Sequence, residues 1–485
     1  MKRKLENYEP KNVLFFFEEI CNIPHVSHHT ELISRYCETF AKQRNLRFYR
    51  DDAGNVVIYK NASPGYEEHK TVILQGHMDM VGAKTEDSGH NFLTDPIDIC
   101  EEVLEDGFIT ANKTTLGGDD GIAVAYMLAI LDDNRLKHPA LEAVFTVDEE
   151  VGLLGANALD TSVLSGGYML NLDSEKEGEF LTGCAGGLRS NVILDGECES
   201  YSGDAFVITI ANLKGGHSGS EIGTGRPSAN ALMGRVLDNI RKLHEFRLIS
   251  LEGGVVDNAI CTKSTAVIAM PGPEQDRLCR LCETVTKDLR NEYAGIDEGI
   301  TVSCEPYSSD GAQAVSVCDT DRMVFLMRHM PYGVTARSAA DVKLVETSLN
   351  PGILRLDCGR FMIGYSVRSS MPSAKRDLAD RLKSLAGFAG GHCGESGDYP
   401  AWPRKKESEL CEIIDGLYRR MYGAAPRFAT IHAGLECGIF ADRMPDLDII
   451  SYGPDMYDIH TFDERLSIQS VKRVYEFTVK LLECL

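Results

Sequence analysis

Short apolar runs alternate with helical patterns over residues 70–173, and the alternation returns near residue 447. The runs have the length of buried strands, and the segments between them place apolar residues at helical spacing. Strands separated by helices are typical of β/α units around a mainly parallel sheet. The strand-like runs are Val72–Leu74, Ala143–Val147, Tyr168–Leu172 and Leu447–Tyr452, and the helical patterns are Gly121–Leu131 and Ile468–Leu485.

Between residues 188 and 388 the pattern changes to alternating strands and amphipathic helices, which favours an inserted α+β domain. Glycines near 186–187 and 389–391 permit the backbone turns that a crossing between domains requires. We therefore predict one discontinuous domain over residues 1–187 and 389–485, and an inserted domain over residues 188–388. The predicted strands include Ala205–Ala211 and Ser264–Ala269, and the predicted helices are Ala229–Leu243 and Pro273–Tyr293.

Length and composition limit what the chain can be. Its 485 residues exceed the length of about 250–300 residues at which a single core usually splits, so we expect two domains. Hydrophobic residues make up 43% and charged residues 25%, as in folded globular proteins. The apolar run Val13–Phe17 is short and is followed by Glu18 and Glu19, which predicts neither a secretory signal nor a membrane span. We expect a cytoplasmic protein whose 15 cysteines are mostly reduced thiols.

The net charge of −23 at pH 7 argues against two kinds of partner. A field of this sign repels nucleic acid and anionic lipid, so we expect neither nucleic acid nor a membrane as partner. Divalent cations are compatible with the charge, but surface acid alone usually only favours solubility. A metal site therefore has to be argued from particular residues.

Metal-binding residue types follow each of the four strand-like runs. They are His77 with Asp79, Glu149 with Glu150, Asp173, and His460. Because ligands bind at the carboxyl edge of an open α/β sheet, these four segments are expected to converge on one site if their strands are neighbours. Asp119 adds a fifth segment, since it lies in the glycine-rich stretch 114–121 just before a helix whose dipole favours a charged carboxylate.

Imidazole and carboxylate ligands together suit Zn²⁺ and other borderline divalent ions such as Co²⁺ or Mn²⁺. A single zinc with five protein ligands would have no open position for water, whereas two zinc ions that share Asp119 leave one. Three carboxylates and a bridging hydroxide would balance the four positive charges of two zinc ions. We therefore predict two Zn²⁺ per chain, held by His77, Asp119, Glu150, Asp173 and His460.

Two more carboxylates have predicted roles beside the metal ligands. Glu149 is free to point toward the reacting water and is the natural general base. Asp79 is placed to accept the second N–H of His77 and so to fix its tautomer. Taken singly, such residues are usually solvated, and it is their joint position at strand ends that favours a site. By the same reasoning, the histidines of the turn His25–His29 are interpreted as solvated.

Six motifs are spread over nearly the whole chain: LQGHMDMV, TLGGDDGIAVA, DEEVGLLGA, NLDSE, GGHSG and HAGLECGIF. Together they resemble the aminoacyl-histidine dipeptidase branch of the co-catalytic two-zinc peptidases. The HMDM, DEE and LD segments are shared with carboxypeptidase G-like and aminoacylase-like relatives, whereas HAGLECG, around His432, points to the dipeptidase branch. The resemblance implies a mainly parallel-sheet α/β zinc peptidase domain with an inserted α+β lid or dimerisation domain.

The resemblance also implies roles for individual residues. His77 and Asp173 would hold one zinc ion and Glu150 and His460 the other, with Asp119 bridging them. In the inserted domain, His217 of the GGHSG motif would stabilise the tetrahedral oxyanion. Substrate-binding positions would be Asn258, Arg368 and His432, and the forked donors of Arg368 suit a peptide carboxylate.

The function that the resemblance implies is hydrolysis of small unblocked peptides, such as Xaa-His dipeptides, by a metal-dependent homodimer. One alternative is an aminoacylase or carboxypeptidase that takes N-blocked substrates, and another is a protein that binds metal or peptide without catalysis. Glu149 argues against the second alternative, because a base beside the ligands serves only catalysis. The sequence contains no Gly-x-Ser-x-Gly elbow, Walker loop or dinucleotide fingerprint, which weakens the serine hydrolase, NTPase and oxidoreductase interpretations.

Overall fold

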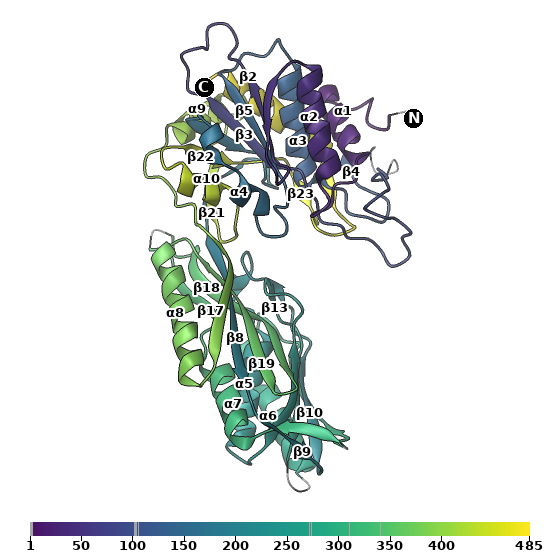
Figure 1. Cartoon of the computed structure of the whole chain (residues 1–485), viewed down its shortest axis with the longest axis vertical. Coiled ribbons are helices and arrows are strands. Elements are labelled where there is room, and N and C mark those ends of the chain that lie inside the picture. The colour runs from purple at the N-terminus through teal and green to yellow at the C-terminus, as the bar shows by residue number, and fades with distance from the viewer. Residues whose placement is uncertain are drawn as a thin grey trace. The chain divides into compact units, whose positions relative to one another are not determined.

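The computed structural model describes residues 3–100, 104, 106–270, 272, 274–309, 311–339 and 341–485. The chain divides into two compact units (Figure 1). The first unit comprises Met1–Gly183, Trp402–Thr430 and Leu435–Leu485, and the second comprises Cys184–Ala401 and Ile431–Gly434. The return to the first unit therefore lies after Ala401 rather than near residues 389–391, because β20 (His392–Tyr399) pairs with β8 (Gly186–Asp195) of the second unit.

The first unit is built around a sheet with the strand order β1-β2-β5-β3-β6-β22-β7-β21. Its central strands are parallel, since β3 pairs with β5 and β6, and β22 pairs with β6. The predicted strand-like runs are thus neighbours, and the predicted mainly parallel sheet is confirmed. The bounds are β1 Arg47–Arg50, β2 Val56–Lys60, β3 Val72–His77, β5 Leu141–Thr146, β6 Tyr168–Asn171, β7 Glu179–Cys184, β21 Arg427–Ile431 and β22 Asp448–Ser451.

Helix α3 (Gly118–Asp132) lies in the core of the first unit, packed against β3 and α1 (Lys11–Cys21). Every residue from Gly118 to Leu131 is buried, as expected for a helix that is apolar on all sides. Its Tyr126 donates a hydrogen bond to the carbonyl oxygen of Val471 in α11 (Ile468–Leu482), at 2.9 Å. The two acidic residues in the first turn of α3 are therefore carried by a firmly packed element.

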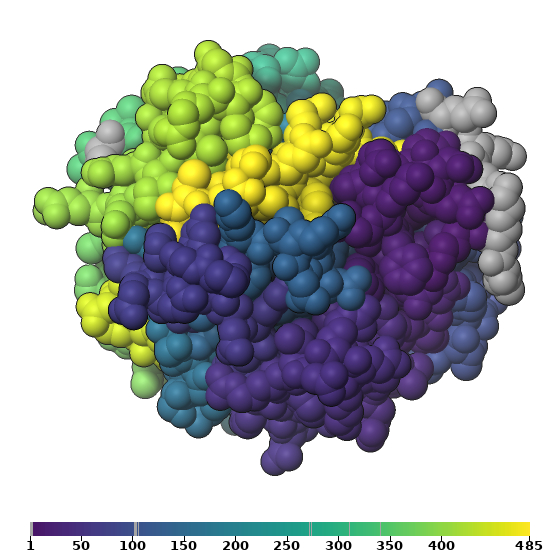
Figure 2. Space-filling model, turned by 90° about the horizontal axis from the view of Figure 1, so that it is seen from above, coloured from purple at the N-terminus to yellow at the C-terminus, as the bar shows by residue number. Residues whose placement is uncertain are grey.

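The N-terminal and C-terminal segments lie side by side on the surface of the first unit, purple and yellow in Figure 2. Asn12 of α1 donates a hydrogen bond to the hydroxyl of Tyr475 in α11, at 2.7 Å. A small sheet, β23-β24-β4, lies beside the start of α11. The remaining elements of the unit are α2 Glu31–Gln43, α4 Leu154–Ala158, α9 Glu409–Tyr422, α10 Cys437–Arg443, β4 Phe108–Ile109, β23 Met456–Tyr457 and β24 Arg465–Ser467.

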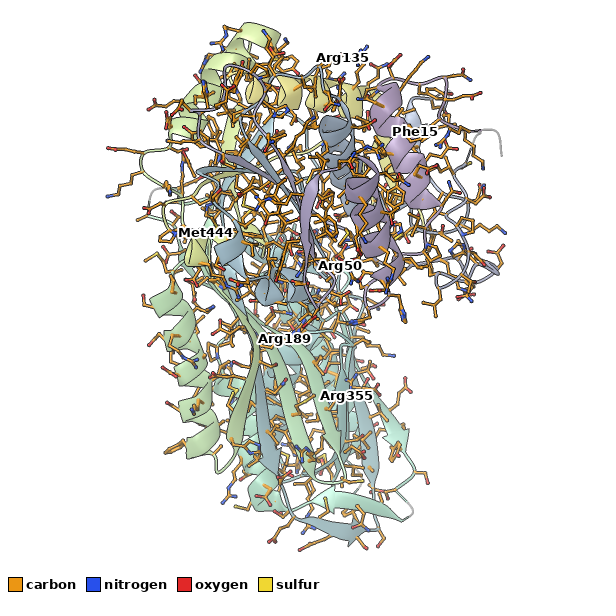
Figure 3. The ribbon with its side chains drawn as sticks, turned by 45° about the horizontal axis from the view of Figure 1, so that its top comes forward. Phe15, Arg50, Arg135, Arg189, Arg355 and Met444 are labelled. Atoms are coloured by element: carbon orange, nitrogen blue, oxygen red, sulfur yellow. The ribbon has the colours of Figure 1, made fainter. Side chains whose placement is uncertain are left out.

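The second unit contains an antiparallel sheet with the order β15-β10-β14-β12-β18-β19-β8-β20, and β17 pairs with β18. Side chains such as Arg189 on β8 and Arg355 on β18 project from its strands (Figure 3). The strands are β10 Ala205–Ala211, β12 Arg247–Gly253, β14 Ser264–Ala269, β15 Thr301–Tyr307, β17 Gly333–Arg337, β18 Val345–Asp357 and β19 Arg360–Ser369. Two short pairs complete the unit: β11 Gly216–His217 with β13 Ala259–Ile260, and β9 Cys198–Tyr201 with β16 Ala312–Val315.

The helices of the second unit are α5 Ala229–Arg241, α6 Gln275–Glu292, α7 Val317–His329 and α8 Pro372–Phe388. Both helices predicted here are present, and α5 ends two positions before the predicted Leu243. The predicted start of the other helix, Pro273, lies outside the described residues. Among the helices that the described residues form, none combines the length and the apolar composition needed to cross a bilayer.

Candidate metal centre and substrate-binding residues

The predicted metal-binding residues of the first unit lie together at the carboxyl edge of its parallel strands. His77 ends β3, Asp173 follows β6, and the pair Glu149 and Glu150 follows β5. His460 lies in the loop after β23. These strands and loops come from distant parts of the sequence, so the convergence expected from the strand order is present in the fold.

Asp119 lies between the two histidines. Its Oδ1 is 3.2 Å from Nε2 of His77, and its Oδ2 is 3.1 Å from Nε2 of His460. Each oxygen of one carboxylate thus faces a different imidazole. Nε2 of His460 is also 2.8 Å from Oε1 of Glu150, and Nε2 of His77 is 3.7 Å from Oδ1 of Asp173. The arrangement forms two adjacent groups that share Asp119.

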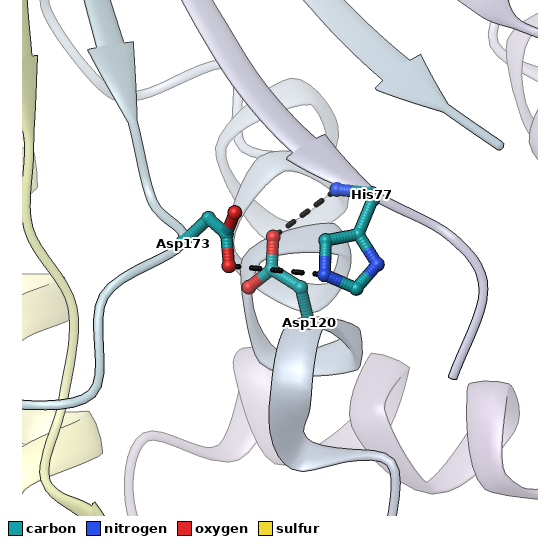
Figure 4. A group of neighbouring side chains, drawn as sticks. All are labelled: His77, Asp120 and Asp173. Carbon is teal, nitrogen blue, oxygen red and sulfur yellow. Dashed lines mark hydrogen bonds and ion pairs between the residues drawn. The ribbon is translucent and has the colours of Figure 1, made fainter. Parts of the chain in front are cut away.

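Asp120 faces the His77 side of the cluster (Figure 4). Its Oδ2 accepts a hydrogen bond from the backbone N–H of His77, at 3.1 Å. His77, Asp120 and Asp173 together form one of the groups whose ligand atoms are close enough to hold a metal ion. Asp120 could not be predicted as part of the site, because two adjacent acidic residues in a sequence do not reveal which of them faces it.

Asp79 connects three parts of the cluster. Its backbone oxygen is 2.9 Å and its Oδ1 is 3.4 Å from Nδ1 of His77. The carboxylate also accepts the backbone N–H groups of Glu149, at 3.0 Å, and Glu150, at 3.3 Å. Asp79 therefore orients His77 and anchors the turn that carries the two glutamates.

Burial and, to a smaller extent, neighbouring carboxylates determine the pKa values in the cluster. Burial raises the pKa of Asp173 well above its ordinary value, and the charge of Asp120 adds to the rise. Burial also raises the pKa of Glu149 well above its ordinary value, with a further contribution from Asp173. Burial would lower the pKa of His460, but its hydrogen bonds to Asp119 and Glu150 raise the pKa to about 11. These raised pKa values mean that the metal-free cluster binds protons on its carboxylates and on His460. A bound divalent cation would supply the positive charge that those protons supply in its absence.

The donor set fits a divalent cation of the zinc type. Three overlapping groups of side chains bring their ligand atoms within 4.8 Å of one another. They are His77 with Asp120 and Asp173, His77 with Glu149 and Glu150, and Asp119 with Glu150 and His460. Mixed imidazole and carboxylate donors suit borderline divalent ions, so the first unit contains a cluster able to bind metal.

His217 of the second unit has a defined tautomer. The backbone N–H of Ser220 lies 3.2 Å from Nδ1 of His217 and can only donate to it. A neutral His217 therefore carries its ring proton on Nε2. The pairing of β11 with β13 places His217 opposite Ala259, so Asn258 lies next to the histidine strand. The backbone oxygen of Asn258 accepts the N–H of Ser218, at 2.8 Å.

Arg368 and His432 form a second polar group in the same unit. Arg368 is opposite Ser348 in the pairing of β18 with β19, and the Ser348 hydroxyl is 2.7 Å from Nε2 of His432. Arg368 donates from Nη1 to the hydroxyl of Tyr399, at 3.0 Å. Both residues are buried, and Nε of Arg368 and Nδ1 of His432 have no hydrogen-bond partner among the described residues. Burial, with the positive charges of Arg368 and His217, lowers the pKa of His432 to about 3.

The loop before Asn258 is tied to the sheet by two arginines. Nε of Arg189 is 2.6 Å from Oδ2 of Asp257, and Arg355 donates to the backbone oxygen of Gly254, at 2.6 Å. Val255 between these anchors remains 84% exposed. The loop is therefore fixed by its polar contacts rather than by burial of its apolar side chains.

In the turn His25–His29, His28 and His29 are exposed, as predicted, whereas His25 is buried. His25 is 2% exposed, and its Nδ1 contacts the backbone oxygen of Ile23. In the same turn, the hydroxyl of Ser27 donates to Oδ2 of Asp79, at 2.8 Å. The interpretation of His25 as solvated was wrong, because the turn packs on the loop after β3, and no local pattern in the sequence reveals that contact.

Glu436 is a second carboxylate of the cluster that could not be predicted from the sequence. It is 0% exposed and accepts a hydrogen bond from the hydroxyl of Thr146, at 2.6 Å. Burial raises its pKa to about 7, although the hydrogen bond from Thr146 opposes the rise. The only available signal was its place in the HAGLECG motif, which carries no physical indication of burial.

The chain is similar in sequence and structure to known peptidases. A profile of the peptidase family M20/M25/M40 matches residues 73–483. The chain is 35% identical over 482 residues to the cytosol non-specific dipeptidase of Escherichia coli (strain K12), covering 99% of both proteins. The crystal structure of aminoacylhistidine dipeptidase from Vibrio alginolyticus matches with a TM-score of 0.86 and 37% identity, over 100% of this chain and 98% of that one. A tripeptidase of Staphylococcus aureus matches in fold alone, with a TM-score of 0.55 and 15% identity over 98% of each chain.

Proposed function

Because this chain belongs to the peptidase family M20/M25/M40, we propose that it is a metal-dependent dipeptidase that hydrolyses the peptide bond of small unblocked peptides, including Xaa-His dipeptides. The observation that carries the proposal is the position of Asp119, whose two oxygens each face one histidine. The full-length similarity to two dipeptidases supports the same substrate class.

Two Zn²⁺ ions are the proposed cofactors, and Co²⁺ or Mn²⁺ could take their place. His77 and Asp173 would hold one ion, Glu150 and His460 the other, and Asp119 both. Bound ions would supply Lewis acidity and lower the pKa of water toward about 7.

The protein groups then have separate proposed tasks. Glu149 accepts the proton of the attacking water and passes it to the leaving amine. Asp79 keeps His77 in the tautomer that leaves Nε2 available for metal, and it holds the turn of Glu149 in place through the hydrogen bond at 3.0 Å.

We assign the recognition of the substrate to the second unit. The Nε2 proton of His217 would stabilise the tetrahedral oxyanion, a role supported by the hydrogen bond that makes Nδ1 an acceptor. Arg368 would bind the peptide carboxylate, supported by its buried Nε without a partner among the described residues. Asn258 and His432, which lie next to these two residues, are the further proposed substrate contacts.

We further propose that the protein is cytoplasmic and forms a homodimer through the second unit. The location is supported by the similarity to the cytosol non-specific dipeptidase. The dimer is supported by exposed aromatic residues on α7 and α8. Phe388 is 84% exposed and Phe325 is 37% exposed, and their ring centroids are 6.3 Å apart. Analytical ultracentrifugation of the wild type and Phe388→Asp tests it, and a monomeric wild type would contradict the dimer.

The experiment that tests the activity is a panel of Xaa-His and other dipeptides, each also supplied in N-acetylated form. Metal-stripped protein is assayed before and after Zn²⁺ is restored. The proposal expects zinc-dependent cleavage of the free dipeptides only. Cleavage of the acetylated forms would instead indicate an aminoacylase or carboxypeptidase, and no cleavage of any peptide by zinc-loaded protein would indicate a binding protein.

A further inference from the structure

Glu464 is a buried carboxylate in the loop that carries His460. It is 2% exposed, and it precedes β24 directly. No lysine, arginine or histidine forms an ion pair with it in the part of the chain that the structure describes. Removing a carboxylate from water costs free energy unless other groups compensate for its charge, so the partners of Glu464 need an explanation.

Those partners are four consecutive backbone N–H groups at the start of α3. Oε2 of Glu464 accepts from Leu116, at 2.8 Å, and Gly117, at 3.1 Å. Oε1 accepts from Gly118, at 2.8 Å, and from Asp119, at 3.4 Å. The positive end of the α3 dipole adds to the stabilisation. One carboxylate therefore binds the whole segment that ends in Asp119.

The two glycines of this segment allow the close approach. Gly117 adopts φ +73°, a conformation that favours glycine. A Cβ atom at Gly118 would lie 3.1 Å from Oε1 of Glu464. The sequence Leu-Gly-Gly-Asp thus builds a concave set of donors that fits this one carboxylate.

Hydrogen bonds and an ion pair within the loop around His460 couple the position of Glu464 to that of His460. The backbone N–H of Glu464 donates to the oxygen of Thr461, at 3.3 Å, and the Thr461 hydroxyl donates to the oxygen of Asp458, at 2.7 Å. Arg465 forms an ion pair with Asp458, at 2.9 Å. Movement of Glu464 would therefore move the turn that contains His460.

We propose that Glu464 is a positioning residue for the metal centre: it fixes Asp119 relative to His460 by binding the backbone before Asp119 while belonging to the loop of His460. This inference rests on the proposed metal-dependent function. The four hydrogen bonds compensate for the burial of Glu464, and because the acceptor and the donors belong to segments far apart in the chain, the same bonds fix the position of one segment relative to the other.

The test compares zinc affinity with folding stability in full-length variants. Metal-stripped wild type and Glu464→Gln are titrated with Zn²⁺ in competition with a chromophoric chelator. An amide group cannot accept four N–H donors. Because Asp119 would contact both ions, we expect the affinity of the centre for Zn²⁺ to fall by about 10–100-fold, the usual effect of removing a residue that orients a metal ligand. Melting of the metal-free proteins is measured alongside.

Glu142→Gln is the matched control. Glu142 is also buried, at 4% exposure, and it accepts the backbone N–H groups of Ser165 and Gly166. It lies near the beginning of β5, at the end of the strand away from the metal cluster. We expect a lower melting temperature for this variant with unchanged affinity for both zinc ions, which separates a loss of stability from a loss of positioning.

Equal zinc affinities of the wild type and Glu464→Gln would overturn the inference, as would an equal loss of affinity in both variants. If Glu464→Gln does not fold, Glu464→Asp is titrated instead, since it keeps the charge but is one methylene shorter. The same loss is expected, and wild-type affinity would overturn the inference. A wild type that binds no zinc would contradict the proposed function itself.

Discussion

The two clusters of polar side chains in this protein have opposite electrostatics. In the first unit, burial and neighbouring carboxylates raise the pKa values of Asp173 and Glu149, as expected where carboxylates outnumber positively charged groups. In the second unit, burial and the charges of Arg368 and His217 lower the pKa of His432 to about 3, so that cluster lacks negative charge. The first is suited to cations and the second to an anionic group of a substrate.

The difference also concerns how each cluster is built. The acidic residues follow parallel strands and share one edge of a sheet, so the strand order alone brings them together. The basic residues lie on antiparallel strands and short loops, where side-chain contacts such as Ser348 to His432 set the arrangement. A change in the acidic cluster should therefore act mainly on chemistry, and a change in the basic cluster mainly on substrate recognition.

The largest expected effect is that of Glu149→Gln in the acidic cluster. Loss of the proposed general base should reduce kcat by about 10²–10⁴-fold. Zinc content should stay near two per chain, because the ligands remain. Steady-state kinetics and metal analysis of the purified variant check both points, and wild-type turnover would exclude Glu149 as the base.

A smaller loss is expected for His217→Ala in the basic cluster. Removal of one donor to an oxyanion typically reduces kcat by about 10²–10³-fold. Zinc content should not change, since His217 belongs to the other unit. If the variant instead lost zinc with normal kcat for the loaded fraction, the assignment of His217 to the oxyanion would be wrong.

Glu436 allows a test of the acidic cluster that does not depend on activity. Its pKa of about 7 exceeds the ordinary value of 4.5, so the folded protein binds a proton that the unfolded chain releases between these pH values. The stability of metal-free protein is therefore expected to fall as pH rises from 4.5 to about 7, by up to about 3 kcal/mol from this group.

Glu436→Gln imitates the protonated form and should remove that part of the decline. The metal-free variant should be more stable than the wild type at pH 8 and similar to it at pH 4. Denaturant unfolding of both proteins across this range measures the effect. Parallel stability curves would mean that Glu436 does not titrate in this window.

The smallest effect is expected for Arg368→Met, tested with dipeptides and their C-terminal amides. Loss of a charge-assisted hydrogen bond costs about 1.5–3 kcal/mol, which corresponds to about 10–150-fold in kcat/KM. The loss should be confined to substrates with a free carboxylate. An equal loss for the amides would show that Arg368 acts only on the structure of the second unit.

Much of the fold could be predicted because its strands are continuous in the sequence. Ala205–Ala211 and Ser264–Ala269 form β10 and β14 with the predicted bounds. β20 could not be predicted, because His392–Tyr399 is mostly exposed and its pairing with β8 alone makes it a strand. That pairing is the reason why the second unit extends beyond residue 391.

The convergence of the candidate site could be predicted for residues that directly follow strands, such as His77 and Asp173. Residues that act through backbone groups of remote segments could not. Glu464 accepts hydrogen bonds from backbone N–H groups near residue 117. Because every residue except proline carries such a donor, the sequence does not indicate which of them a distant carboxylate binds. Periodicity and motif spacing report side chains, so such contacts require coordinates.

Because the first unit comprises separate stretches of chain, its parts are synthesised at different times. Residues up to Gly183 emerge first, followed by most of the second unit, and the loop of His460 comes after both. Asp119 and Glu150 are therefore made long before their proposed partner histidine. During synthesis these carboxylates can therefore form at most part of the proposed metal centre, which is complete only after the C-terminal stretch has joined the sheet.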